Sequence, residues 1–111
     1  VNVCDSYGWA LDNRNSGILC GLSEPLASAE RPFGEWQHID VWFVNRHCTI
    51  FLNGVKTVDG LPVVGVTGGA IDCDVNAPGP FVLQGDHSGC DFRNMVFTPV
   101  LSAKDALVAA P

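Results

Sequence analysis

Residues 37–58 read QHIDVWFVNRHCTIFLNGVKTV, and this stretch decides the fold. Apolar and polar residues alternate from Gln37 to Val44, so that successive side chains point to opposite faces of an extended chain. An alternation of period two is typical of a strand with one buried face. We therefore expect a half-buried strand here. One face carries Ile39, Val41 and Phe43, and the other carries His38, Asp40 and Trp42.

The residues that follow predict two more strands and two turns. Asn45-Arg46-His47 is polar and predicts a turn, and the β-rich run Cys48–Leu52 comes directly after it. Asn53-Gly54 then separates this run from another β-rich run, Val55–Val58. Asn-Gly between two such runs indicates a hairpin, because a type I′ turn needs a positive φ at both central residues. The sequence thus predicts an antiparallel meander of three strands.

Short β-rich runs on both sides of the meander predict further strands. They are separated by turns rich in Gly and Pro, of which the chain has 12 and 7. Near the end, Ser102 is placed to cap a short helix over residues 103–108. About seven short strands joined by turns are typical of an antiparallel β-sandwich. We predict an all-β sandwich domain over residues 1–99 and a C-terminal tail over residues 100–111. The outer strands are predicted at residues 1–4, 16–21, 81–84 and 91–99.

The charge of the chain excludes some classes of partner. Twelve acidic residues stand against six Lys and Arg, which gives a net charge of −6. Nucleic acids and anionic lipids need clustered positive charge, so neither is expected to bind. No apolar run approaches the ~20 residues that cross a bilayer, so no membrane span is expected. Neutral polar ligands such as sugars are compatible with this composition.

The cysteines favour an oxidising compartment. No C-x-x-C pair occurs, which argues against a zinc site or a redox motif. Wide spacing is typical of disulfides in secreted or periplasmic proteins, so we predict at least one disulfide and an extracytoplasmic location. The alternative is that several cysteines are small buried core residues. An odd number leaves one thiol free or paired with another chain. The five are Cys4, Cys20, Cys48, Cys73 and Cys90.

Three stretches in a fixed order resemble one family. They are VNVCDSYG at residues 1–8, the segment from SGILCG at residues 16–21 to RPFGEW at residues 31–36, and GPFVLQGDH at residues 79–87 followed by FRN at residues 92–94. With the Asn53-Gly54 hairpin between them, this order resembles the 3-keto-disaccharide hydrolase-like domains. The resemblance covers residues 1 to about 99. It implies a jelly-roll of the concanavalin and laminin-G type, in a secreted or lipid-anchored protein that acts on glycosides.

The sequence departs from the family pattern at three points. Members usually have one or two strands before the segment that matches Val1, and a Glu that serves as an acid or base in the sugar cleft. Asn2 stands where Gln is usual, and Cys20 stands where Tyr is usual. If nothing precedes Val1, the sandwich lacks its first strands. We then expect an upstream segment or an additional protein chain to cover the open sheet edge.

The resemblance places candidate catalytic groups in loops after matching strands. Asp5 lies in the first of these loops, and Asp86 and His87 lie in the last. A 3-keto sugar can be cleaved by elimination, because the ketone acidifies the neighbouring C–H. One general base then suffices, where glycoside hydrolysis otherwise needs two carboxyl groups. We predict that these three residues are catalytic. The alternative is that Asp5 and Asp86 hold backbone N–H groups in turns.

Four other residues are predicted to bind substrate. Tyr7 and Trp42 offer aromatic faces that suit the C–H side of a pyranose ring. Arg31 can donate paired hydrogen bonds to a sugar or a carboxylate. Asn2 completes the set, at the position where the family usually has Gln. The alternatives are a partner surface for Trp42 and a surface salt bridge for Arg31.

No metal or other cofactor is expected. The three histidines show no metal-ligand spacing. The excess of acids permits a calcium site, but no D-x-D-x-D-G loop occurs. The leading hypothesis is a carbohydrate-handling β-sandwich that resembles glycoside hydrolases acting on 3-keto sugars. The rival hypothesis is a non-catalytic sugar-binding or structural subunit of a larger extracytoplasmic assembly.

Overall fold

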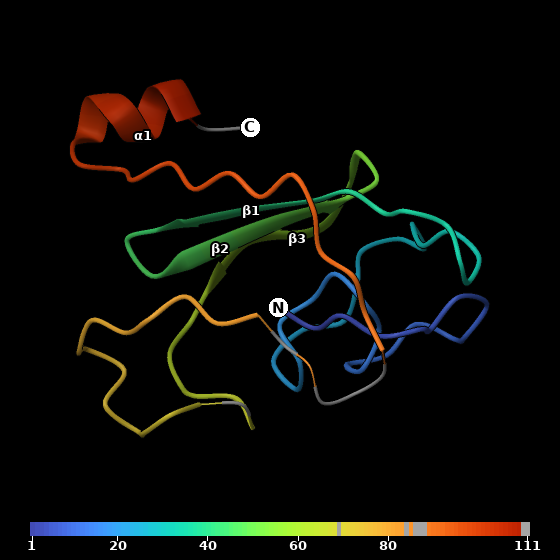
Figure 1. Cartoon of the computed structure of the whole chain (residues 1–111). Coiled ribbons are helices and arrows are strands. Elements are labelled where there is room, and N and C mark those ends of the chain that lie inside the picture. The colour runs from blue at the N-terminus through green and yellow to red at the C-terminus, as the bar shows by residue number, and fades with distance from the viewer. Residues whose placement is uncertain (69, 84, 86–88, 110–111) are drawn as a thin grey trace.

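A three-stranded antiparallel meander forms the centre of the molecule (Figure 1). The structure is a computed structural model, and it describes residues 1–68, 70–83, 85 and 89–109. The strands lie in the order β1-β2-β3, and the fold is all-β apart from one short helix, α1. The bounds are Ile39–Val44 for β1, His47–Leu52 for β2, Val55–Pro62 for β3 and Ala103–Ala109 for α1. The predicted meander is confirmed.

Both turns of the meander consist of two residues with positive φ. Asn45-Arg46 joins β1 to β2 with φ of 49° and 62°, and Asn53-Gly54 joins β2 to β3 with φ of 52° and 80°. Positive φ at both central residues is the mark of a type I′ turn, whose twist matches that of the flanking strands. His47 was predicted within the first turn, but it belongs to β2 and pairs with Val44. A two-residue turn leaves it in register with β1.

β3 runs past its predicted end at Val58 as far as Pro62. The register between β2 and β3 shifts around Thr49, which has no partner residue in β3. The Thr49 hydroxyl instead accepts a hydrogen bond from the backbone N–H of Gly60 at 2.9 Å. Gly60 has a φ of 56°, a value that suits a residue without a side chain. This irregularity lets the strand continue past the point where its alternating pattern stops.

The core covers one face of β2 and β3. Its members from the meander pack against two side chains from the N-terminal segment. A Cβ atom on Gly17, which has a φ of 72°, would meet the Leu52 side chain at 3.1 Å, so the two segments touch closely there. The buried cluster consists of Ile18, Leu19, Cys48, Ile50 and Val58, with Ile39, Leu61 and Val63 packed partly against it.

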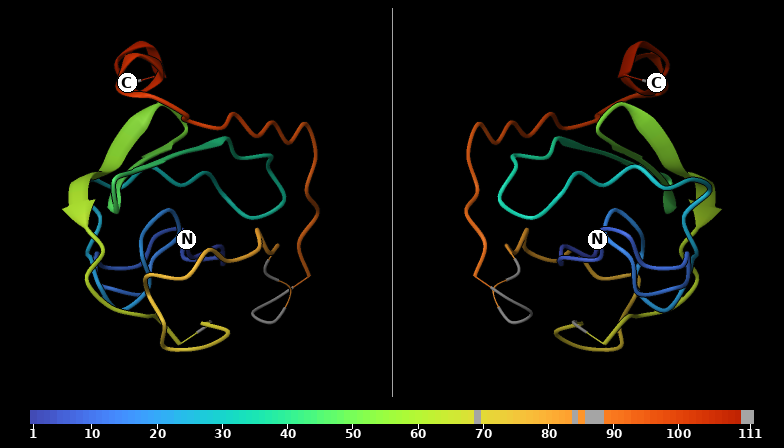
Figure 2. Two further views of the ribbon diagram at one scale, coloured as in Figure 1. Left: turned by 90° about the vertical axis from the view of Figure 1, so that its left-hand side faces the viewer. Right: turned by 90° about the vertical axis from the view of Figure 1, so that its right-hand side faces the viewer.

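Thr57 ties the N-terminal segment to the sheet from within the core. Its side chain is 1% exposed, and its hydroxyl donates a hydrogen bond to the Gly17 carbonyl at 2.5 Å. Its own carbonyl accepts the N–H of Leu26 at 2.9 Å. Residues 1–34 therefore form an irregular layer over the core face of the sheet, where a sandwich carries its second sheet (Figures 1 and 2).

The strands predicted at residues 1–4 and 16–21 are not regular strands. These segments do lie side by side, because Asn2 donates its N–H to the Ile18 carbonyl at 2.8 Å and accepts the N–H of Gly17 at 2.9 Å. The second segment then turns at Gly21, whose φ is 76°. The prediction of strands was wrong here because Gly17 and Gly21 adopt positive φ, so the backbone pairing of the two segments does not continue beyond Asn2.

The strands predicted at residues 81–84 and 91–99 are likewise irregular where the structure describes them, and Gln84 lies outside the described residues. Residues 93–100 run alongside β1 without forming part of the sheet (Figures 1 and 2). Their apolar side chains stay exposed, and Val96 is 89% exposed. Residues 93–100 have the composition of a strand but form no backbone ladder with β1 among the described residues. Composition alone therefore does not make this segment a strand.

The apolar face of β1 is only partly buried, which corrects the expectation of a half-buried strand. Val41 pairs with Ile50 and Phe43 pairs with Cys48, so both side chains lie on the core face. They are nevertheless 46% and 59% exposed, because the core cluster is centred on β2 and β3 and does not include them. The core face of the sheet is thus open over β1.

Ser102 caps α1 as predicted. Its hydroxyl oxygen accepts the N–H of Asp105 at 3.1 Å, and the helix begins at the next residue, Ala103. The described residues contain no helix long and apolar enough to cross a membrane. The domain boundary predicted between residues 99 and 100 stays a prediction.

All five cysteines are free thiols, so the predicted disulfide does not form in this structure. Cys48 is a core residue, 1% exposed, and fits the alternative interpretation of the sequence. The Cys4 thiol donates a hydrogen bond to the Arg14 carbonyl at 3.4 Å. Cys20, Cys73 and Cys90 are exposed in separate loops.

We expect Thr57→Val to lower the free energy of unfolding by about 1–3 kcal/mol, because the Gly17 carbonyl loses its buried donor. Thr98→Val changes an exposed threonine and should alter the same quantity by less than ~0.5 kcal/mol. Urea unfolding followed by tryptophan fluorescence measures both variants. Equal effects of the two substitutions would contradict the tie between Thr57 and the N-terminal layer.

We expect Cys48 to resist thiol reagents in the folded protein. Burial raises the pKa of the Cys48 thiol, so little reactive thiolate is present at neutral pH. Titration with a chromogenic disulfide reagent should label Cys20, Cys73 and Cys90 quickly and Cys48 only after unfolding. Cys48→Ala should abolish the thiol released on unfolding, and Cys20→Ser should not. Rapid labelling of Cys48 without denaturant would show that the core is open.

Candidate functional site

Ser6 anchors a tight turn that carries two of the predicted site residues. The carbonyl of Ser6 accepts the N–H of Trp9 at 3.0 Å, and Gly8 supplies the positive φ of 80° that the turn uses. Ser6 itself is 1% exposed. Its neighbours Asp5 and Tyr7 are both exposed, so the turn presents a carboxylate and an aromatic ring to solvent.

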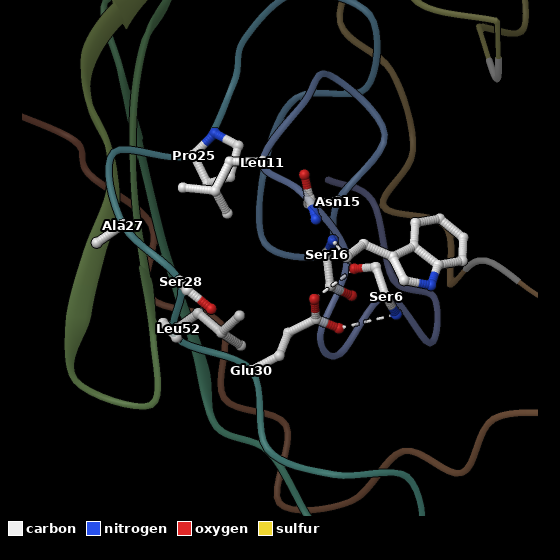
Figure 3. Close-up of a pocket in the computed structure, with 11 residues that line it drawn as sticks. Ser6, Leu11, Asn15, Ser16, Pro25, Ala27, Ser28, Glu30 and Leu52 are labelled. Atoms are coloured by element: carbon white, nitrogen blue, oxygen red, sulfur yellow. Dashed lines mark hydrogen bonds between the residues drawn. The ribbon is translucent and has the colours of Figure 1, made fainter.

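A carboxylate from a distant segment holds this turn in place (Figure 3). Glu30 accepts the N–H of Ser6 through Oε1 at 3.2 Å, and it accepts the Ser6 hydroxyl through Oε2. Arg31 directly follows Glu30 in the chain. This pair of hydrogen bonds therefore joins the turn of Asp5 and Tyr7 to the segment that carries Arg31.

Ser16 fastens the same turn from its other side. Its N–H donates to the Ser6 hydroxyl oxygen at 2.9 Å. Its own hydroxyl accepts the N–H of Cys4 and lies at the same 2.9 Å from the Cys4 carbonyl, to which it donates. Because Ser16 is next to Gly17, which the sheet holds through Thr57, the turn is connected to the core of the molecule.

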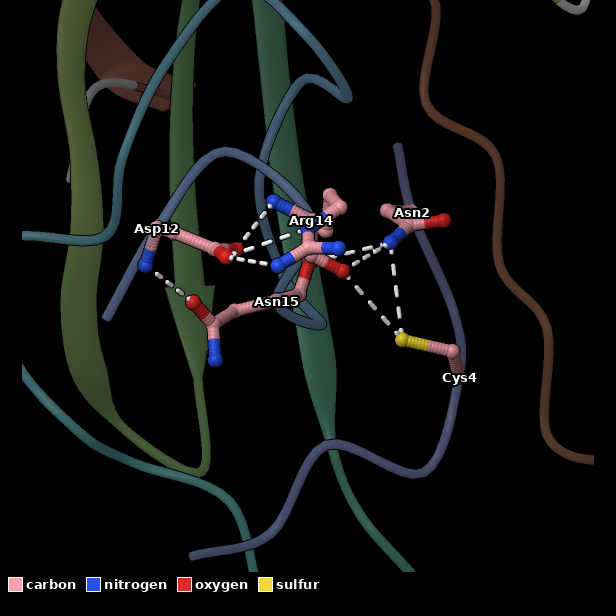
Figure 4. A network of polar contacts seen from close by, with 5 residues as sticks. All are labelled: Asn2, Cys4, Asp12, Arg14 and Asn15. Carbon is pink, nitrogen blue, oxygen red and sulfur yellow. Dashed lines mark hydrogen bonds and ion pairs between the residues drawn. The ribbon is translucent and has the colours of Figure 1, made fainter. Parts of the chain in front are cut away.

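Asn2 is buried in a second polar network, shown in Figure 4. Its side-chain amide donates to the carbonyls of Arg14 and Asn15 at 2.6 and 3.1 Å. In the same loop Arg14 forms an ion pair with Asp12 at 2.6 Å. The hydrogen bond from Arg14 lowers the pKa of the Asp12 carboxyl. Asn2 thus shapes the loop of residues 12–15, and its predicted contact with substrate stays a prediction.

Arg31 is exposed and is steered by its neighbours in the chain. Its guanidinium donates to the Trp36 carbonyl at 3.3 Å, and its N–H donates to the side-chain oxygen of Gln37 at 3.0 Å. The segment is held further by Asn53, whose amide nitrogen donates to the Ala29 carbonyl at 2.8 Å and to Gln37 at 3.1 Å. Asn53, in the turn between β2 and β3, thus positions the irregular segment that carries Glu30 and Arg31.

Trp42 is not brought to this place. Trp42 pairs with Thr49 on the face of the sheet opposite the core, whereas the turn of Asp5 belongs to the layer on the core face. Asp86 and His87 lie outside the described residues. Their predicted catalytic roles stay predictions.

The hollow beside Ser6 and Glu30 is small. Its volume is about 10 Å³, enough for one water molecule and far below the size of a sugar ring. Its walls come from the turn, from residues 11–16, from residues 25–30 and from Leu52 (Figure 3). A larger groove of about 350 Å³ lies elsewhere, between the end of β1 at Phe43 and the start of α1.

No cluster of three or more His, Cys, Asp and Glu side chains gathers in the part of the chain that the structure describes. Glu30 was not singled out from the sequence, because it lies in an irregular segment and its partner is 24 residues away. No local pattern marks such a pair.

The model of the 3-keto-alpha-glucoside-1,2-lyase-like domain family matches residues 1–98 of the chain. No curated protein and no solved structure matches the chain. The matched region includes the turn of Asp5, the Glu30–Arg31 segment and the whole meander. The chain belongs to the 3-keto-alpha-glucoside-1,2-lyase-like domain family.

Proposed function

We propose that this chain handles carbohydrates through the turn of Asp5 and Tyr7 together with Arg31, and that it cleaves 3-keto glycosides by elimination. One observation carries the proposal. Glu30 binds both donors of Ser6 and so joins the turn that carries Asp5 and Tyr7 to the segment that carries Arg31, which supports a site built from a carboxylate, an aromatic ring and a guanidinium. These three groups have the chemistry of a base, a stacking platform for a sugar and a donor to an oxygen.

In this reaction Asp5 removes the proton from C2 of the sugar, next to the C3 ketone. The electron pair of the C2–H bond forms the C1=C2 double bond, and the C1–O bond to the aglycone breaks. The aglycone leaves as an alcohol after it takes up a proton, for which we propose His87 with Asp86. Arg31 stabilises the negative charge that develops on the ketone oxygen. Addition of water to the unsaturated product completes a net hydrolysis.

We expect Asp5→Asn to slow the release of nitrophenol from a nitrophenyl 3-keto-glucoside by about 10²–10⁴-fold, because the amide cannot accept the C2 proton. Asp59→Asn is the matched control, since Asp59 lies on β3 and pairs with Lys56 at 3.0 Å. This control should release nitrophenol at the wild-type rate. Deuterium at C2 should slow the wild-type reaction if proton removal limits the rate.

Equal rates for Asp5→Asn and the wild type would reject Asp5 as the base. Release without formation of the unsaturated ketone, followed by its ultraviolet absorbance, would reject elimination in favour of direct hydrolysis. No release by the wild-type chain, combined with saturable binding of the 3-keto sugar, would support a non-catalytic sugar-binding module.

A second candidate function is that of a structural or sugar-binding subunit in a larger assembly. Two observations favour it. The hollow beside Ser6 is too small for a sugar ring, and the core face of the sheet is open over β1 at Val41 and Phe43. An additional strand, from a partner chain or from an upstream segment, would extend the sheet at β1 and bring its own side chains beside Val41 and Phe43.

The hydrogen-bond pattern of β1 defines how such a strand would pair. Val44 and His47 flank a two-residue turn, so the backbone groups of every second residue from Val44 point toward β2. The groups of Ile39, Val41 and Phe43 then point away from the sheet. Within the described residues these outward groups have no ladder partner, since β1 is at the edge of the sheet.

We expect the isolated chain to self-associate through this edge, where a second copy would take the place of residues 93–100, which run alongside β1 without pairing with it (Figure 1). Val41→Lys places a charge on the open edge and should shift the population toward monomer in sedimentation experiments. Val64→Lys is the control, because Val64 is 82% exposed and lies beyond β3. A monomeric wild-type chain, or equal effects of both lysines, would argue against pairing at β1.

The extracytoplasmic location and the assembly partner are parts of this proposal too. The resemblance to a family of secreted or lipid-anchored proteins and the open edge of β1 are what support them. Fractionation of the producing cells tests the location directly.

A further inference from the structure

All four polar groups of Ser6 are engaged, and this fixes the turn in one orientation. Its N–H and its hydroxyl donate to Glu30, its hydroxyl oxygen accepts the N–H of Ser16, and its carbonyl accepts the N–H of Trp9. Ser6 is 1% exposed, while Asp5 and Tyr7 on either side are exposed. Ser6, which is buried and has all its polar groups hydrogen-bonded, thus separates two exposed candidate site residues, Asp5 and Tyr7.

We propose that Glu30 is a positioning residue, which holds the Asp5–Tyr7 turn in its reactive geometry through Ser6. The consequence for catalysis rests on the function proposed above, whereas the effect on the turn does not. A positioned base reacts faster because its orientation is set before the substrate arrives.

The carboxylate is the group that this position requires. Ser6 offers two donors in nearly the same direction, and each oxygen of Glu30 accepts one of them. A glutamine would have one oxygen for two donors and would bring its NH₂ group against the second donor. A shorter or apolar side chain would leave the buried N–H of Ser6 unpaired, which costs more than the bond itself contributes.

In the part of the chain that the structure describes, Glu30 makes its polar contacts with Ser6 and with no charged partner. Within the described residues no Lys, Arg or His forms an ion pair with Glu30, and its hydrogen bonds go to Ser6. On the other side of the turn, Ser16 is held by Cys4 and by the neighbouring core. Glu30 is therefore the contact that joins the turn to the segment carrying Arg31 (Figure 3).

The test uses Glu30→Gln, with Glu24→Gln as the matched control, since Glu24 is exposed in the same loop segment. Hydrogen exchange should show the amides of Ser6 and Trp9 exchanging at least ~10-fold faster in Glu30→Gln and unchanged in Glu24→Gln. The kcat for the 3-keto-glucoside should fall about 10–100-fold in Glu30→Gln with little change in KM. In an Asp5→Asn background, Glu30→Gln should cause no further loss, because it acts through Asp5.

The outcomes separate this inference from the proposed function. Faster exchange of the turn in Glu30→Gln with an inactive wild-type chain supports the positioning of the turn and rejects the enzymatic function. Wild-type activity with unchanged exchange and unchanged kcat in Glu30→Gln rejects the role of Glu30. Equal losses in the wild-type and Asp5→Asn backgrounds would mean a general structural effect and also reject it. If Glu30→Gln does not fold, Ser6→Ala removes the same hydroxyl contact, and the same exchange and kcat tests apply.

Discussion

The buried hydrogen bond from Thr57 to the Gly17 carbonyl fixes where the N-terminal layer lies on the sheet. Everything at the candidate site depends on that placement. Ser16 directly precedes Gly17 in the chain, the N–H of Ser16 binds Ser6, and Ser6 binds Glu30. The turn with Asp5 and Tyr7 is thus connected to the core through a continuous series of bonds. A site on an irregular layer gains its rigidity from such a connection, because no ladder of backbone bonds supplies it.

Local chemistry made the meander and the helix cap predictable. Asn53-Gly54 adopts positive φ at both positions because Asn and Gly tolerate that conformation. Ser102 accepts the N–H of Asp105 because a serine at the N-cap can reach the free N–H groups of the first helical turn. The strands at residues 1–4 and 91–99 were wrongly predicted for the converse reason. Whether a β-rich run becomes a strand depends on a partner edge, and that partner is not encoded in the run itself.

The candidate site was foreseen in part. The family resemblance pointed to Asp5, and side-chain chemistry pointed to Tyr7 and Arg31. The Ser6–Glu30 contact joins the two segments that carry them, and neither line of reasoning indicated that contact. The Ser6–Glu30 hydrogen bond joins residues 24 apart in irregular segments, so no periodic pattern in the sequence indicates it. The predicted disulfide failed for a related reason. Cysteine count cannot distinguish a bridging thiol from a core residue such as Cys48, whose 1% exposure is visible only once β2 is folded.

The open edge of β1 and the shallow surface at Asp5 belong to the same face of the sheet. Val41 and Phe43 point to the side that carries the N-terminal layer, and both are left uncovered by it. A strand added at β1 would bury these side chains and raise a wall on the side of the sheet where the turn lies. Sugar-binding sites are concave, because a ring must lose much of its contact with water to bind. In the functions proposed above, completion of the sandwich at β1 and formation of a cleft would therefore be one structural event, and both proposals depend on the same edge.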